Sequence, residues 1–271
     1  MRPLSPRQAD ILRIARHEGR VDVESLATGF AVTPQTIRKD LNELCKANEL
    51  QRVHGGAVYP SSTANIGYLL RREMASLSKQ RIGAAAARLI PSNASLILNL
   101  GTTTEQVAQA LKNHEGLMVV TNNLNVAMIL YDAPSVEVVV AGGILRKSDG
   151  GIVDSAAIDF IRQFKSDFAI VGASAIDEEG WMLDFDYREV RVAQTILRQA
   201  RKRILVADSM KFGRPAPVKI AHLSEIDVFV TDQRPPKAIC DLCEQTGVQL
   251  EICGDDEGLA EIVALAGAHL V

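Results

Sequence analysis

The sequence predicts an α/β protein in two parts, a small winged helix-turn-helix followed by a larger three-layer α/β/α domain. In residues 1–58, three short helical patterns precede a hairpin that contains a Gly-Gly pair. From residue 93 onward, short runs of β-branched residues alternate with helical stretches, which is typical of a parallel sheet covered on both faces. We therefore expect a winged helix-turn-helix at 1–58, a linker at 59–80 and a larger domain at 81–271.

Composition and charge are those of an ordinary globular protein. Of the 271 residues, 47% are hydrophobic and 23% are charged, which is enough apolar material for a real core. No apolar run approaches the ~20 residues of a membrane helix, and the start lacks the hydrophobic stretch of a signal peptide. We expect a cytoplasmic protein with no membrane partner.

The net charge of −3 argues against indiscriminate binding to nucleic acid, but the charge is uneven along the chain. Residues 1–58 hold nine Lys/Arg against seven Asp/Glu, and the remainder holds 21 against 26. The four cysteines include Cys240 and Cys243 in a C-x-x-C spacing, without a second pair or a His cluster to complete a zinc site. We interpret them as structural thiols and expect neither a metal nor a cofactor.

The N-terminal elements follow from local capping signals. Residues 5–8 form a capping box with Pro at the first helical position, and Gly19 ends that helix. Asp22 can cap a short second helix at 23–29. A tight turn then leads to a third helix, which Thr33 caps, so the second and third helices form a helix-turn-helix.

The third helix, residues 34–44, organises the domain. Ile37, Leu41 and Leu44 lie on one apolar stripe, and the opposite face holds side chains that bind base edges and phosphates. An ordinary amphipathic surface helix is the alternative for this element alone. Residues 50–58 then predict a hairpin, the wing, with Arg52 and His54 near its tip, although His54 could be a turn residue without a function. Three helices and a hairpin in this order favour DNA binding. The predicted DNA-binding residues are Thr33, Gln35, Thr36, Arg38, Lys39, Asn42, Arg52 and His54.

Residues 60–65 are polar and rich in structure breakers, so we place the domain boundary there. One helical segment is expected from residue 66 to about 90, charged at its start and rich in small residues later. Seven strands are then predicted at 96–100, 117–121, 136–141, 168–172, 203–207, 228–231 and 248–252.

Polar residues follow the carboxyl ends of these strands, where ligands of parallel sheets bind. Glycine and threonines at 101–104 precede a helix expected at 106–111, which describes an anion site, although a plain helix cap is the alternative. Arg146 and Lys211 would supply positive charge, but Lys211 could be a solvated side chain and Asp208 only a cap. Tyr187 and Glu189 either reach the pocket or begin an exposed helix that we expect at about 192–201. The predicted effector-binding residues at these positions are Gly101, Thr102, Thr103, Thr104, Thr121, Asn122, Asn123, Gly142, Gly143, Arg146, Asp149, Tyr187, Glu189, Asp208 and Lys211.

Taken together, the helix at 32–44, the wing at 52–57 and the later Gly-Thr-Thr, Thr-Asn-Asn, Ala-Gly-Gly and Asp-x-x-Lys-Phe-Gly motifs resemble the DeoR family of bacterial repressors. The resemblance covers essentially the whole chain. It implies a winged helix joined to a sugar-phosphate-sensing domain of the ribose-5-phosphate isomerase/CoA-transferase type. Asn99 joins the predicted effector site through this resemblance, at a position where the family usually has Asp.

The resemblance implies a repressor that binds operator double-stranded DNA and is released by a phosphorylated polyol or sugar. Within the family, the motifs point to the repressors of glycerol 3-phosphate use, so glycerol 3-phosphate is the expected effector and fructose 1-phosphate is the alternative. A homodimer or homotetramer is expected, because paired recognition helices ~34 Å apart match successive turns of DNA. A sugar-phosphate isomerase that uses Asp208 and Lys211 is the competing hypothesis, but we expect no catalytic residues.

Overall fold

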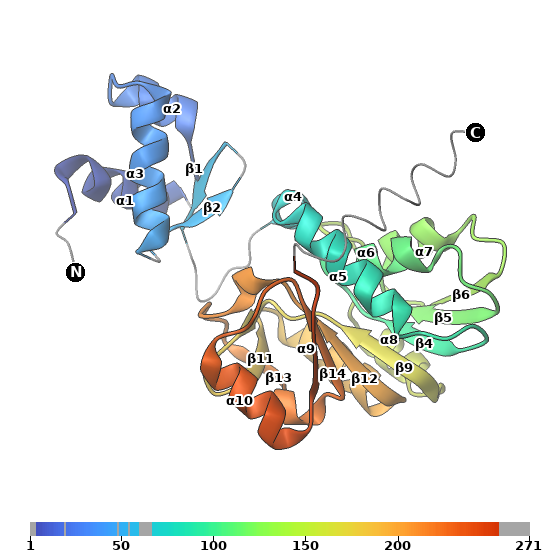
Figure 1. Cartoon of the computed structure of the whole chain (residues 1–271). Coiled ribbons are helices and arrows are strands. Elements are labelled where there is room, and N and C mark those ends of the chain that lie inside the picture. The colour runs from blue at the N-terminus through green and yellow to red at the C-terminus, as the bar shows by residue number, and fades with distance from the viewer. Residues whose placement is uncertain (1–3, 19, 48, 54, 60–66, 255–271) are drawn as a thin grey trace, which may run out of the picture. The chain divides into compact units, whose positions relative to one another are not determined.

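The computed structural model describes residues 4–18, 20–47, 49–53, 55–59 and 67–254 of the chain (Figure 1). The chain divides into two compact units, Met1–Met74 and Ala75–Val271. Each unit has its own hydrophobic core, as expected of independently packed domains.

The first unit contains the predicted winged helix-turn-helix. Its three strands form a small antiparallel sheet in the order β1-β3-β2. The elements are α1 (Pro6–Glu18), β1 (Arg20–Asp22), α2 (Val23–Gly29), α3 (Pro34–Lys46), β2 (Gln51–Val53), β3 (Gly56–Val58) and α4 (Tyr68–Glu73).

Three of the local signals in this unit are confirmed, while Gly19 lies outside the described residues. Ser5 and Gln8 form the reciprocal bonds of a capping box at the start of α1, at 3.0 and 3.2 Å. Asp22 accepts from the backbone N–H of Ser25 at the start of α2. The apolar stripe of α3 is fully buried in the domain core with residues of α1 and α2.

One buried carboxylate connects the first and third helices. Asp40 points from α3 into the domain, where it pairs with Arg7 at 2.5 Å and accepts a longer bond from Gln8. A buried carboxylate is costly unless it is paired, so this contact makes the packing of α1 on α3 specific. Because Asp40 is buried in this contact, its carboxylate is not part of the exposed face of α3.

The single helix expected from residue 66 to about 90 is wrong within the described part of that segment. The chain forms α4 and then α5 (Ser76–Arg88), and Ala75 between them is in the left-handed region with φ of 50°. The helix α5 packs closely on α6 (Thr102–Leu111), where Gly83 lies directly against the backbone of Gln106.

The second unit is built on a seven-stranded sheet with the order β15-β14-β12-β9-β4-β5-β6, in which all neighbours are parallel. All seven predicted strands belong to it. They are β4 (Ser95–Leu98), β5 (Leu117–Thr121), β6 (Val136–Val140), β9 (Ser166–Val171), β12 (Ala200–Val206), β14 (Val228–Thr231) and β15 (Gln249–Ile252).

Helices cover both faces of this sheet, which confirms the three-layer α/β/α prediction. The helices α5, α6 and α7 (Leu124–Leu130) lie together on one face (Figure 1). The opposite face packs against α8 (Ser155–Ile161), α9 (Tyr187–Arg198) and α10 (Lys237–Thr246). Smaller elements complete the unit: β7 (Leu145–Arg146), β8 (Gly151–Ile152), β10 (Ala175–Ile176), β11 (Trp181–Asp184), β13 (Val218–His222) and the 3-10 turns η1 (Ser209–Lys211) and η2 (Leu223–Glu225).

The strand order reverses between β4 and β9. From β4 the chain winds to β5 and β6 on one side, and from β9 to β12, β14 and β15 on the other. Connections on the two sides of such a reversal leave it in opposite directions, and sheets of this kind bind ligands outside the carboxyl ends of the two central strands.

Two helices begin earlier than expected. The helix α6 starts at Thr102 rather than 106, and α9 starts at Tyr187 rather than 192. Asp186 caps α9 by accepting from the backbone N–H of Arg188 at 2.9 Å. Because Asp184 lies two residues earlier, the sequence alone does not show which acidic residue is the cap. Tyr187 and Glu189 are therefore part of the first turn of α9. None of the described helices is long and apolar enough to cross a bilayer.

The close approach of α5 to α6 can be tested with Gly83→Ala. An added Cβ would lie 2.6 Å from the backbone carbonyl of Gln106, so we expect a loss of about 1–3 kcal/mol in the free energy of unfolding. Gly29→Ala on α2 is the control, since nothing lies within 4 Å of the new Cβ, and there we expect a gain of at most about 1 kcal/mol. Urea denaturation of both variants checks this; equal stabilities would contradict the close contact.

Candidate functional site

The polar face of α3 is free of the domain core. Gln35, Arg38, Lys39 and Asn42 are all exposed, and Arg38 has one weak ion pair with Glu24 at 3.7 Å. These side chains offer amide and cationic donors along one side of a rigid helix. Donors of this kind suit base edges and phosphates in a major groove.

The remaining predicted DNA-binding residues support this surface locally. Thr33 accepts from the backbone N–H of Thr36 at 3.3 Å, and the two hydroxyls lie 2.9 Å apart, so both help to set the start of α3. Arg52 donates to the carbonyl of Gly56 at 3.1 Å and braces the hairpin. His54 lies outside the described residues.

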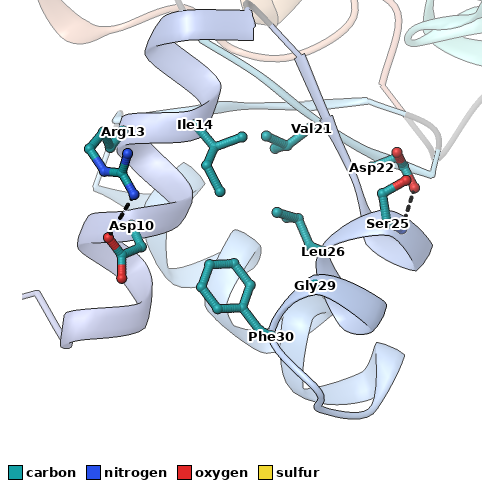
Figure 2. Close-up of a pocket in the computed structure, with 9 residues that line it drawn as sticks. All are labelled: Asp10, Arg13, Ile14, Val21, Asp22, Ser25, Leu26, Gly29 and Phe30. Carbon is teal, nitrogen blue, oxygen red and sulfur yellow. Dashed lines mark hydrogen bonds and ion pairs between the residues drawn. The ribbon is translucent and has the colours of Figure 1, made fainter.

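A pocket of about 400 Å³ that the sequence did not predict lies between α1, β1 and α2 (Figure 2). Ile14, Leu26 and Phe30 provide apolar walls, and the Asp10–Arg13 ion pair lies at its margin. Asp22, also at the margin, is used to cap α2. Two carboxylates and one guanidinium do not favour a DNA phosphate, so we assign this pocket no role in the DNA surface.

In the second unit, the start of α6 has the geometry of an anion site. Gly101 occupies the cap position with φ of 142°, and no side chain caps the helix. The hydroxyl of Thr104 instead donates to the carbonyls of Asn99 and Gly101, at 2.8 and 2.7 Å, and holds the loop. Thr102 and Thr103 are buried in the first turn. The N–H groups of this turn are thus available to a ligand, with the positive end of the helix dipole behind them.

The Thr-Asn-Asn sequence after β5 is largely structural. The hydroxyl of Thr121 donates to the carbonyl of Leu98 at 2.8 Å and accepts from the N–H of Asn123. Asn123 caps α7, and the amide of Asn122 donates to the carbonyl of Ile152 at 3.0 Å. These residues therefore hold the β7–β8 hairpin against the strand ends.

Arg146 is surrounded by carboxylates, whereas the sequence predicted that it supplies positive charge to an anionic ligand. From the β7–β8 hairpin it donates twice to Asp149, at 2.8 and 2.6 Å, and also pairs with Asp186 and Glu189 at the start of α9. Its charge is already compensated by carboxylates from two elements. The expectation that Arg146 supplies free positive charge to an anion is not met in this arrangement.

The ionic cluster around Arg146 contains more carboxylates than cations. Burial and this excess of negative charge raise the pKa of one carboxylate. Burial and the neighbouring Asp184 raise the pKa of Glu189 to about 7, against the opposing effect of Arg146. A hydrogen bond from Arg188 lowers the pKa of Asp186. The hairpin is thus attached to α9 through a group that can exchange a proton near neutral pH.

The other predicted residues are distributed around the strand ends. Asp208 is buried after β12 and caps η1 by accepting from the N–H of Met210, and Lys211 is the last residue of η1. Gly143 has φ of 145° and lies against the carboxylate of Asp154. Gly142, Gly143 and Tyr187 are all exposed.

Several residues that position the site are not among the predicted ones. Glu105 is buried in the first turn of α6 and accepts from the amides of Asn123 and Asn125, at 3.4 and 3.1 Å. Asp232, after β14, accepts from the N–H and hydroxyl of Ser209. An acidic residue directly after a buried strand was the available signal for Asp232.

Two family profiles match this chain. The DeoR-like helix-turn-helix domain matches residues 7–63, and the DeoR C terminal sensor domain matches residues 74–233. The chain belongs to the DeoR family.

Curated relatives extend the match over nearly the whole chain. The glycerol-3-phosphate regulon repressor of Escherichia coli K12 is 43% identical over 247 residues, which cover 91% of this chain and 98% of the repressor. The protein of the same name from Haemophilus influenzae is 43% identical, with 92% and 97% covered. The transcriptional repressor GlcR of Bacillus subtilis is 32% identical, with 92% and 96% covered.

Solved structures resemble this DeoR-family chain more distantly. Ribose 5 phosphate isomerase A from Neisseria gonorrhoeae has 13% identity and a TM-score of 0.38, and covers 57% of this chain and 56% of its own. The translation initiation factor eIF-2B of Pyrococcus horikoshii has 16% identity and a TM-score of 0.42, with 78% and 72% covered. At these values no property of either protein transfers to this chain.

The cysteine environments of the DeoR-family chain are those of packed thiols. Cys243 is buried on α10, and burial raises the pKa of its thiol to about 11. Cys240 donates to the carbonyl of Pro235 at 3.3 Å. No cluster of three metal-binding side chains occurs within the described ranges.

The raised pKa of Glu189 predicts a pH dependence of stability. Between its ordinary value of 4.5 and about 7, the folded state binds a proton that the unfolded state releases, so stability falls as pH rises through this window. We expect the melting temperature of wild type to drop more than that of Glu189→Gln between about pH 5 and about pH 7.5. Glu137→Gln, at an exposed position on β6, is the control. Parallel curves for wild type and Glu189→Gln would exclude this residue as the source.

Proposed function

We propose that this DeoR-family chain is a transcriptional repressor that binds operator DNA and releases it when a phosphorylated polyol fills the sensor domain. Glycerol 3-phosphate is the effector that we propose first. The observation that carries this choice is the 43% identity, across 98% of its length, to a glycerol-3-phosphate regulon repressor. Fructose 1-phosphate is the alternative effector within the same class of regulator.

The proposed DNA-binding surface is the exposed polar side of α3 with the wing. Its direct contacts would be Gln35, Arg38, Lys39 and Asn42, supported by Thr33 and Thr36 at the helix start. The hairpin residue Arg52 would contact phosphate, and we retain His54 as a proposed contact from the sequence alone. Burial of Ile37, Leu41 and Leu44 fixes which side of α3 is presented.

The proposed effector site lies at the carboxyl ends of β4, β5, β9 and β12. The uncapped first turn of α6 would bind the phosphate, and Lys211 would add charge from η1. Asn99 and Asn122 would face the organic part of the effector. Release follows if the effector binds more tightly to a state of the protein that cannot bind DNA.

The proposed division of labour follows the expected domains: 1–58 for DNA, 59–80 as linker and 81–271 for the effector. We also propose a homodimer or homotetramer that acts in the cytoplasm, because palindromic operators are bound by paired domains. The exposed apolar side chains Leu124, Met128 and Tyr131, at helical spacing on and just after α7, are a surface that association would bury.

We do not propose an isomerase. The carboxylate of Asp208, which that hypothesis requires as a base, is 1% exposed and accepts from the N–H of Met210 at 3.1 Å. A winged helix also has no role in isomerisation. Turnover of ribose 5-phosphate that Asp208→Ala abolishes would reverse this assignment.

Arg38→Ala tests the DNA-binding surface. Loss of one cationic contact should weaken operator binding by about tenfold or more and leave effector binding unchanged. Fluorescence anisotropy with labelled operator measures the first, and calorimetry the second. Arg13→Ala is the matched control, because Arg13 is an exposed arginine of the same unit that pairs with Asp10 on α1. If both variants bind the operator equally, α3 does not present Arg38 to DNA.

A thermal-shift series tests the effector. A ligand that binds only the folded state at ~100 times its dissociation constant adds ~2.7 kcal/mol to stability. We expect glycerol 3-phosphate to raise the melting temperature and to release labelled operator over the same concentration range. A rise in melting temperature with fructose 1-phosphate alone would identify that compound as the effector in place of glycerol 3-phosphate. No change in melting temperature with any sugar phosphate would contradict the proposed site.

A further inference from the structure

Two buried amide oxygens at the ends of the central strands accept no hydrogen bond. Oδ1 of Asn99 and Oδ1 of Asn122 are inaccessible to solvent and have no donor among the described residues. The two side chains are 6% and 0% exposed. Buried polar atoms in folded proteins almost always have a partner, so such atoms indicate that a donor belongs there.

The strand register brings these two residues side by side. Leu98 pairs with Thr121 in the parallel β4–β5 ladder, and Asn99 and Asn122 are the next residue on each chain. Two residues earlier, Ile97 and Val120 point into the cluster that packs against α8 and α9. Because side chains alternate along strands, both asparagines continue on that face, while α6 leaves toward the other.

Asn122 has a fixed orientation. Its Nδ2 donates to the carbonyl of Ile152 at 3.0 Å, so a flipped amide would place two oxygens against each other. The free atom is therefore an acceptor. For Asn99 either orientation of the amide suits a hydroxyl, because a hydroxyl both donates and accepts.

The groups at these strand ends thus fall into two chemically different sets. The uncapped N–H groups of α6, next to Gly101, favour an anion. The asparagine pair is neutral and has acceptors to satisfy, which a hydroxyl can do and a carboxylate cannot. A ligand that satisfies both parts has a phosphate at one end and hydroxyl groups on an uncharged carbon chain at the other.

We propose that Asn99 and Asn122 recognise the hydroxyl groups of the effector and thereby select phosphorylated polyols over phosphorylated acids and alkyl phosphates. This inference rests on the proposed function, because it assigns the specificity of the same effector site.

Three ligands test it by calorimetry with the full chain: glycerol 3-phosphate, propyl phosphate and glycerate 3-phosphate. Wild type should bind propyl phosphate at least about tenfold more weakly than glycerol 3-phosphate, because the buried acceptors then stay unpaired. Glycerate 3-phosphate, with a carboxylate in place of the terminal hydroxymethyl group, should also bind more weakly. Equal affinities for the three ligands would overturn the inference and leave the proposed function intact. Failure of all three to bind would overturn both.

Asn99→Ala is the informative variant, since Asn122 also holds the hairpin. It should bind glycerol 3-phosphate about as weakly as wild type binds propyl phosphate, with propyl phosphate itself unaffected. A preserved preference for glycerol 3-phosphate would overturn the inference. If this variant does not fold, Asn99→Asp carries the test: it keeps an acceptor of the same shape, so the preference should persist although both phosphates bind more weakly near the added charge.

Thr231→Val is the matched control. The hydroxyl of Thr231 is also buried and without a partner, at the carboxyl end of β14. Two strands, β12 and β9, separate it from β4. The variant should leave the ratio of the two affinities unchanged; an equal effect of Thr231→Val would mean that the ratio reports general loss of buried polar groups, and the inference would fall.

Discussion

The structure of the second unit depends on which groups form hydrogen bonds with the backbone where its central strands end. At the ends of β4 and β5, the hydroxyls of Thr104 and Thr121 donate to the carbonyls of Asn99, Gly101 and Leu98. Buried carbonyls require such partners. Separately, no side chain caps α6, so its first N–H groups stay available to a ligand.

The asparagines that follow β5 also form hydrogen bonds that fix the loops at the strand ends. Asn123 caps α7 and faces Glu105, and Asn125 bonds both Glu105 and the carbonyl of Asp149. These bonds attach the β7–β8 hairpin to the strand ends from one side. Arg146 attaches it to α9 from the other through Asp186 and Glu189. These side-chain hydrogen bonds and ion pairs add to the backbone bonds and the buried Ile152 of the hairpin, and they respond to charge and protonation more than apolar packing does.

In the first unit, burial of one carboxylate has a comparable effect. Asp40 pairs with Arg7 within the domain, which fixes α3 to α1. Glu43, an exposed carboxylate of α3, accepts a hydrogen bond from the amide of Gln8 on α1 at 2.8 Å. Both carboxylates are thus engaged by α1, which matters because a carboxylate that faced the DNA would repel phosphate. The acidic pocket between α1 and α2 lies on a different part of the domain surface, consistent with a surface that is not selected for DNA.

Local patterns in the sequence determined the elements: the caps at Ser5, Asp22 and Thr33, the buried stripe of α3, and the seven apolar strands. Each depends on residues within a few positions of one another, so each could be predicted before the chain was folded. Contacts between distant segments could not. The partners of Arg146 lie up to 43 residues away, and only the packing of the hairpin on α9 decided that its charge is compensated. Likewise, only the strand register placed Asn99 beside Asn122, and only the backbone at Ala75 divided one helical pattern into two. Charge pairs and strand neighbours are properties of the assembled sheet, because folding alone decides which strand ends meet.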